Sequence, residues 1–255
     1  MYPKRRGLCG ILILAASLTV LGCGSSGNSN VRAVNASPGF APFTYQVAQI
    51  GVASSPPYGT EGVQPQGDYT TSDTSGNYRF VGAGANQSLL TYVTQGTPLT
   101  SVQQSFLKGT YYTIVSLGSA PNMALMTLTD DDSAPQSGDY KLRFMDASGT
   151  AGPVDVYITA AGVGGTGGTN ATPIIGNIQF RQVTSYLQLS PGTLQVQVTQ
   201  QGNPSNVLLT AAFSPAGANI YSLFLLDPAN SGTGAYGLLV VHDPVSAAST
   251  MGSGT

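Results

Sequence analysis

The chain has little charge and few reactive side chains. Only 8% of its 255 residues are charged, and it holds one His, two Cys and no Trp, whereas about 25% of residues are charged in an average soluble protein. One His and two Cys cannot form a Cys/His zinc site, which takes four such ligands. They also confine nucleophilic catalysis based on Cys or His to the surroundings of His242. Nine Lys and Arg without a basic run argue against nucleic acid as a partner, because its binding requires several neutralised phosphates.

The N-terminus carries the pattern of an export signal. Lys4, Arg5 and Arg6 precede an apolar run from Leu8 to Leu21, which is short for a membrane-spanning helix of about 20 apolar residues. A basic start, an apolar centre and a small residue before the cut predict a cleaved signal peptide over residues 1–22. The sequence Val20-Leu21-Gly22-Cys23 resembles a bacterial lipobox. The resemblance implies that Cys23 is lipidated and becomes the first residue of the mature chain.

Lipidation at Cys23 makes the membrane a partner of the chain. Several acyl chains on one Cys give stable anchoring, and residues 24–30, Gly-Ser-Ser-Gly-Asn-Ser-Asn, predict a flexible tether. Loss of the three basic residues of the signal takes the formal charge from −2 to −5. Gly24 is not the Asp that retains lipoproteins at an inner membrane. By that analogy we expect an exported protein at the outer membrane or cell surface of a bacterium.

The remaining chain is an internal repeat. Val31–Ser37 (VRAVNAS) recurs as Leu142–Ser148 (LRFMDAS), an offset of 111 residues that continues from Pro42–Val47 to Pro153–Ile158. Repeat periods of 20–50 residues are typical of solenoids, so this longer period indicates two copies of one domain. The predicted organisation is a signal peptide over 1–22, lipidated Cys and tether over 23–30, copy one over 31–136, copy two over 137–244 and a disordered tail over 245–255.

Both copies have the pattern of an all-β fold. Short runs of Val, Thr, Tyr and Leu alternate with turns rich in Gly, Pro, Asn and Ser, and Leu194–Thr199 alternates apolar and polar residues as a strand with one wet face does. About seven strands in each copy predict two tandem immunoglobulin-like antiparallel β-sandwich domains. Ser54–Asn77 and Gly162–Thr172 are expected to be long loops, and Asp130–Asp139 is expected to join the domains.

Acidic residues supply two candidate sites. Asp130, Asp131 and Asp132 could ligate calcium through their oxygens, although no EF-hand spacing is present; the alternative is a solvated acidic linker. Asp146 and Asp155 in copy two could serve as the paired carboxylates of a glycoside hydrolase.

The repeat favours a structural role for Asp146. Its copy-one equivalent is Asn35, and Thr44 stands where copy two has Asp155. Asn and Asp before Ala-Ser suit side-chain-to-backbone hydrogen bonds in a turn. We therefore expect Asn35 and Asp146 to stabilise equivalent turns, and no catalytic residue is assigned.

His242 and the tyrosines are expected to be structural. His242 ends an apolar strand, and we place its copy-one equivalent within Asp130–Asp132; the chain has no Gly-x-Ser-x-Gly motif for a Ser nucleophile. Sugar-binding surfaces usually rely on Trp, which is absent. Tyr residues at strand positions are expected to pack in the core: Tyr45, Tyr112, Tyr157 and Tyr221.

The repeated element, Arg-φ-x-(Asn/Asp)-Ala-Ser-x(4)-Pro-φ with φ apolar, resembles the bacterial domain-of-unknown-function family numbered 4397. Asp146-Ala147-Ser148 and Pro153–Tyr157 match it best, and Asp146 and Asn35 stand where the family pattern often has His. The resemblance covers residues 31 to about 243 and implies tandem domains on an exported lipoprotein.

These patterns together predict a non-catalytic envelope protein with a structural or adhesive role and no cofactor. Its expected partners are the membrane, through the lipid anchor, and a glycan or another envelope protein. The alternatives are an envelope hydrolase acting through the acidic residues of copy two and a surface stalk stiffened by calcium.

Overall fold

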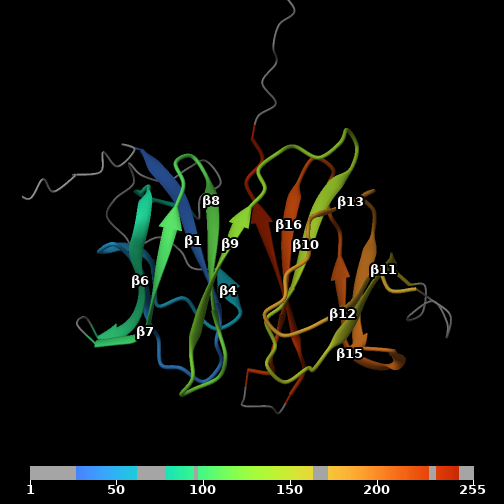
Figure 1. Cartoon of the computed structure of the whole chain (residues 1–255). Coiled ribbons are helices and arrows are strands. Elements are labelled where there is room, and N and C mark those ends of the chain that lie inside the picture. The colour runs from blue at the N-terminus through green and yellow to red at the C-terminus, as the bar shows by residue number, and fades with distance from the viewer. Residues whose placement is uncertain (1–26, 62–77, 95–96, 163–171, 230–233, 247–255) are drawn as a thin grey trace, which may run out of the picture.

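The computed structural model describes residues 27–61, 78–94, 97–162, 172–229 and 234–246, and these form strands and no helix (Figure 1). The strands β1–β9 form one sandwich and β10–β17 form a second beside it. The first comprises β1 (Asn28–Ala36), β2 (Thr44–Val47), β3 (Ile50–Ser54), β4 (Thr60–Glu61), β5 (Arg79–Gly82), β6 (Gly84–Thr94), β7 (Thr97–Phe106), β8 (Tyr111–Leu117) and β9 (Ala124–Asp130). The second comprises β10 (Tyr140–Asp146), β11 (Val154–Ala160), β12 (Ile175–Ile178), β13 (Leu187–Leu189), β14 (Leu194–Gln200), β15 (Asn203–Phe213), β16 (Ile220–Leu226) and β17 (Gly237–Asp243).

Each sandwich has an inner sheet facing the other sandwich and an outer sheet. The inner sheets are β4-β1-β8-β9, with β5 also paired to β1, and β13-β10-β16-β17. The outer sheets are β3-β2-β6-β7 and β12-β11-β14-β15. The all-β fold with two sandwiches confirms the prediction from the strand patterns and the repeat.

One strand pair in each sandwich is parallel rather than antiparallel. β1 pairs with β8, and β10 pairs with β16, in parallel register. Parallel neighbours require a crossover connection, and here the strands of the outer sheet lie between them in the chain. The expectation of a wholly antiparallel sandwich is therefore corrected at this pair, while the other strand pairs described are antiparallel.

Three apolar clusters hold the molecule together. One fills the first sandwich around Tyr45 and Ile114, and one fills the second around Phe144 and Val196. The third lies between the two inner sheets and draws on both sandwiches: Val34, Ala36, Val115, Leu117, Leu128, Met145, Ala147, Phe224, Leu226 and Val241. The inner sheets are therefore buried on both faces, which explains why β16 is apolar except for Ser222 and why each of its residues is buried.

Strand β1 begins earlier than the sequence indicates. Its first residue is Asn28, so the expected tether over 23–30 is wrong in its last three residues. The polar residues there are held by neighbours in the sheet: Ser29 is buried and its hydroxyl donates to the Leu107 carbonyl at 2.7 Å, and the Asn30 N–H donates to the Thr110 carbonyl at 2.9 Å. Tertiary pairing here overrides the weak strand propensity of Asn and Ser.

Several predicted features lie outside the described residues. They include the signal peptide, Cys23, most of the loop over 54–77, the Gly-rich part of the loop over 162–172 and the tail beyond Ser246. In the described part of the chain, no helix is long and apolar enough to cross a bilayer.

Candidate functional site at the seam of the two sandwiches

A reciprocal pair of buried salt bridges joins the sandwiches. Arg32 on β1 extends across the seam to Asp243 at the end of β17, and Arg143 on β10 extends the other way to Asp130 at the end of β9. Longer contacts complete a square of alternating charge, with Arg32 3.9 Å from Asp130 and Arg143 4.0 Å from Asp243. The four side chains are at most 4% exposed. We call this arrangement the charge lock.

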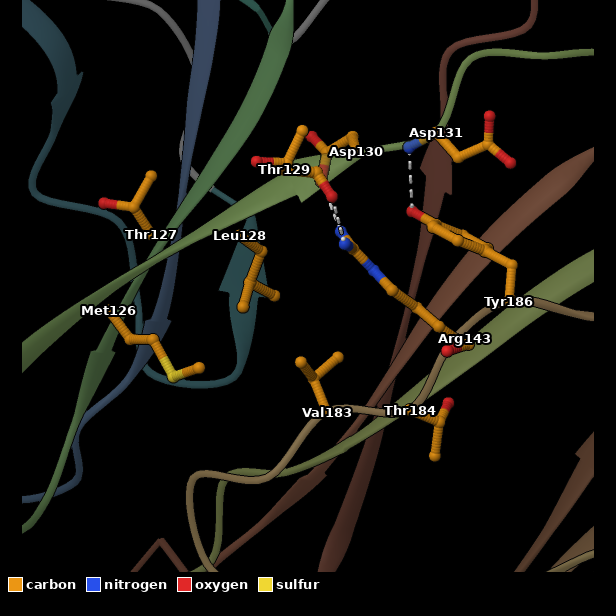
Figure 2. A pocket seen from close by; sticks show the side chains of 11 residues that line it. Met126, Thr127, Leu128, Thr129, Asp130, Asp131, Arg143, Val183, Thr184 and Tyr186 are labelled. Carbon is orange, nitrogen blue, oxygen red and sulfur yellow. Dashed lines mark hydrogen bonds and ion pairs between the residues drawn. The ribbon is translucent and has the colours of Figure 1, made fainter. Parts of the chain in front are cut away.

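In the charge lock, the Asp130 carboxylate accepts hydrogen bonds from both sandwiches. It accepts from Thr113 at 2.8 Å and Tyr78 at 2.7 Å within its own sandwich. From the second sandwich, Arg143 donates to the same carboxylate and to the Thr129 carbonyl at 2.8 Å (Figure 2).

The Asp243 side repeats the same chemistry. Its carboxylate accepts from Ser222 at 2.6 Å and Tyr186 at 2.6 Å. From the first sandwich, Arg32 donates to Asp243 and to the His242 carbonyl at 2.6 Å. The two halves of the lock are therefore related by an approximate two-fold axis between the repeats.

The ionisation of the lock follows from this geometry. Burial by itself would raise the pKa of Asp243, but the charges of Arg32 and Arg143 outweigh it and hold that pKa below its ordinary value. Burial raises the pKa of Tyr78 and of Tyr186, so both stay neutral donors. Each tyrosine ring also packs against an arginine, with Arg32 4.8 Å from the Tyr78 ring centroid and Arg143 4.9 Å from that of Tyr186.

An open trough runs along the seam beside the lock (Figure 2). It consists of two adjoining cavities of about 460 and 440 Å³ that share Met126, Val183 and Thr184. The first is bounded by β9 and the chain segment 183–186 of the second sandwich, with Arg143 crossing between them. The second continues along residues 175–178 and 181–184.

All charged side chains that line the trough, except Arg181, are paired within the protein. Arg143 is bound to Asp130, and Asp131 accepts from Lys141 at 2.8 Å. Arg181 is exposed, stacks on Phe180 with 5.0 Å between guanidinium and ring, and has no carboxylate partner among the described residues. The rest of the lining is apolar or neutral and polar: Met126, Thr127, Leu128, Thr129, Ile175, Asn177, Ile178, Gln182, Val183, Thr184, Ser185 and Tyr186.

The structure separates the three acidic residues proposed to bind calcium. Asp130 belongs to the charge lock, Asp131 accepts from Lys141, and Asp132 accepts from Ser246 at 2.5 Å. In the described ranges, no group of three His, Cys, Asp or Glu side chains is placed to hold a metal ion.

The predicted turn role of Asn35 and Asp146 is confirmed. The Ser37 N–H donates to Asn35 Oδ1 at 3.0 Å, and the Ser148 N–H donates to Asp146 Oδ1 at 2.9 Å. Asp146 is fully buried, and its Oδ2 has no hydrogen-bond partner among the described residues. Burial, with repulsion from Asp227, raises its pKa to about 7.

The two carboxylates proposed for hydrolysis are held by different parts of the second sandwich. Asp155 accepts the Asn177 N–H and the Gly202 N–H, both at 2.8 Å, one on each oxygen. No hydrogen bond between described residues joins it to Asp146, which stabilises the turn at Ser148.

His242 is exposed at the end of β17, as expected, and its ring lies 4.7 Å from that of Tyr221. Its equivalent in copy one is Thr129, because Tyr112 pairs with Thr129 as Tyr221 pairs with His242. The expectation of an equivalent within Asp130–Asp132 is therefore wrong by one residue. The four strand tyrosines named above are buried as predicted.

Sequence reasoning did not identify the charge lock, although one signal for it was present. Arg32 and Arg143 occupy the same position of the repeat, and each stands within an apolar strand. A charge kept in both copies of a buried strand indicates a buried partner. The partner lies in the other copy, 211 residues away for Arg32 and Asp243. A local sequence pattern cannot identify a partner that is so distant in the chain.

Solved structures share only a loose likeness with the chain. A carbohydrate-binding module of family CBM26 from Eubacterium rectale Amy13K, solved with maltoheptaose, is 11% identical, with 83% of this chain and 95% of that chain covered and a TM-score of 0.26. A structure described as α-glucan binding by a streptococcal virulence factor is 10% identical, with 77% and 92% covered and a TM-score of 0.23. We infer no ligand for this chain from similarities of this size.

A family model matches nearly all of the described chain. No curated protein matches this chain in sequence. The model of the domain of unknown function DUF4397 matches residues 29–157 and 167–252. The first segment covers the first sandwich and extends through β10 into β11, the second covers most of the remaining second sandwich, and two matched segments are consistent with two copies of the domain. The chain therefore belongs to the DUF4397 family and carries its domain in two tandem copies.

Proposed function

We propose that this chain is a lipid-anchored protein of the bacterial envelope, at the outer membrane or cell surface, whose two sandwiches act as one non-catalytic binding module. The observation that carries the proposal is the charge lock. It fixes the two sandwiches against each other, so that the trough along their seam keeps one shape. A preformed concave surface is what a binding site requires.

The acidic residues support binding rather than hydrolysis. Both oxygens of Asp155 accept backbone N–H groups, and the Asp146 side chain is fully buried in a turn. A glycosidase needs two carboxyl groups that face one substrate across a gap of about 5–10 Å. These two residues are occupied in separate structural roles.

Membrane anchoring is tested by metabolic labelling. Cells that express the full chain are grown with labelled palmitate, with Cys23→Ser as the variant and Cys9→Ser as the matched control. We expect label on the wild type and on Cys9→Ser and none on Cys23→Ser, and the Cys23→Ser protein in the soluble exported fraction. Label on Cys23→Ser would refute anchoring at this residue.

A single incubation experiment distinguishes a binding role from a catalytic role. The purified chain is incubated with fractionated envelope glycans and envelope proteins, and both retention and release of products are measured. We expect retention without turnover. Turnover that is lost in Asp146→Asn or Asp155→Asn would establish the hydrolase instead.

A further inference from the structure

The trough has a free strand edge as one wall. Among the strands that the structure describes, β9 is the last of its inner sheet and pairs on one side only, with β8. Its residues Met126–Asp130 line the trough. At the far end of the strand, the Thr129 carbonyl is occupied by Arg143 at 2.8 Å. Because alternate residues of an antiparallel edge strand direct their main-chain groups outward, Leu125 and Thr127 share the outward orientation of Thr129. Their N–H and C=O groups are therefore placed where an added strand could pair with them.

The opposite side of the trough is a second extended segment whose inner side is already paired. Val183 forms an antiparallel bridge with Met145, and the Thr184 N–H donates to the Phe144 carbonyl at 2.9 Å. The side chains of Val183 and Tyr186 line the trough on the side of β9 (Figure 2), whereas the Thr184 hydroxyl accepts from the Phe144 N–H at 3.0 Å. One side of the trough therefore offers backbone hydrogen-bonding groups, and the opposite side offers a mostly apolar surface.

The two copies differ at a position that lines the trough in the second sandwich. Val34 pairs with Glu61 in the first sandwich, and Met145, its equivalent, pairs with Val183 in the second. Glu61 forms an ion pair with Arg32 at 3.4 Å, whereas Val183 adds apolar surface to the trough. The second sandwich therefore has the apolar side chain of Val183 where the first has the charged side chain of Glu61.

We infer that the trough binds an extended polypeptide segment, which adds as a strand to the free edge of β9 and places alternate apolar side chains on Val183 and Met126. This rests on the proposed binding function and names its ligand class. A stretch of five residues of β9 spans about 17 Å of an extended strand, and exposed Arg181 at one end favours a segment with an acidic residue there. A glycan is less suited, because Tyr186, the aromatic ring in this lining, has one face against Arg143 and its hydroxyl on Asp243.

The test begins with a displayed library of random nine-residue peptides, selected on the purified full chain and then synthesised. We expect selected peptides to alternate apolar and polar residues and to carry an acidic residue. Hydrogen exchange with a bound peptide should slow the outward-facing amides of Leu125 and Thr127, which is the signature of strand pairing, whereas the amides of Ala124, Met126 and Leu128 already face β8. Unprotected amides of Leu125 and Thr127 in the complex would overturn the inference.

Substitutions locate the site. Val183→Glu, which installs the charge found at the equivalent position of the first copy, should weaken peptide binding at least tenfold. Val207→Glu, at an exposed apolar position on β15, is the matched control and should have no effect. Arg181→Glu, on an exposed residue, retains the fold even if Val183→Glu does not, and should weaken binding about three- to tenfold. Peptide binding that is unchanged in Arg181→Glu and in a folded Val183→Glu would overturn the inference.

Neutral oligosaccharides separate this inference from the proposed function. If dextran oligosaccharides bind the trough in a Val183-dependent way and peptides do not, the binding function stands and the peptide inference fails. If the chain instead degrades the oligosaccharides, the proposed function itself fails.

Discussion

At the residue scale, the buried charges of the lock should be essential to stability. Removing one partner of a buried ion pair leaves the other charged and unpaired, which costs about 3–5 kcal/mol. Asp130→Asn is therefore expected to lower the free energy of unfolding by about that amount in urea titrations. Asp131→Asn is the matched control, since the Asp131–Lys141 pair is partly exposed, at 35% and 15%, and such pairs contribute about 0–1 kcal/mol. Equal effects of the two substitutions would contradict the lock.

Asp146 gives the protein a pH-dependent stability. Its pKa is raised to about 7 in the fold, so the folded state binds its proton more tightly than the unfolded chain does. This contribution is complete below the unfolded pKa near 4 and is lost as the pH rises to about 7. Wild-type stability should therefore fall by about 2 kcal/mol between pH 4.5 and pH 8, at about 1.4 kcal/mol per unit of pKa difference, less relaxation of the site.

The matched variant is Asp146→Asn, which installs the residue that copy one has at Asn35. It cannot ionise, so its stability should change less between pH 4.5 and pH 8 and should exceed that of the wild type at pH 8. Chemical denaturation at several pH values measures both. An unchanged pH slope in Asp146→Asn would show that another group is responsible.

At the element scale, Asp155 holds three segments of the second outer sheet in place. Its oxygens accept from Asn177 in β12 and from Gly202 in the β14–β15 hairpin, while Asp155 itself belongs to β11. Asp155→Ala leaves two N–H groups without this acceptor, and each such loss costs about 1–3 kcal/mol. We expect a thermal midpoint several degrees lower, whereas Asp132→Ala, whose partner is exposed Ser246, should leave it within about one degree. A midpoint unchanged in Asp155→Ala would refute this role.

At the scale of the whole molecule, the two sandwiches should unfold together. They share the apolar cluster between the inner sheets as well as the charge lock, so exposing the seam of one destabilises the other. We expect a single calorimetric transition for the wild type. Leu128→Asp, which places a charge in the shared cluster, should split it into two; two transitions already present in the wild type would contradict the coupling.

Local and periodic information in the sequence was enough for the all-β class and the duplication, but not for the parallel pairs β1–β8 and β10–β16. Alternation along Leu194–Thr199 predicts strand β14 but not its surroundings, because Gln197 and Thr199, expected on a wet face, are buried. The 111-residue offset predicts two copies of one domain. The turn bonds of Asn35 and Asp146 were also predictable, because they join residues only two positions apart. Each of these features depends on neighbours in the chain, and composition and spacing report neighbours directly.

The tertiary structure alone decided what the charges do and where a ligand could bind. Asp130 reads as a possible calcium ligand in the sequence, yet in the fold it meets Arg143 and Thr113 at the seam. Asn28–Asn30 read as a tether and belong to β1. The trough depends on β9 and Val183 coming together from different sandwiches. Such contacts join residues far apart in the chain, so they follow from the packing of whole sheets, whereas the β-rich pattern, the turns and the duplication are visible in neighbouring residues and in the repeat.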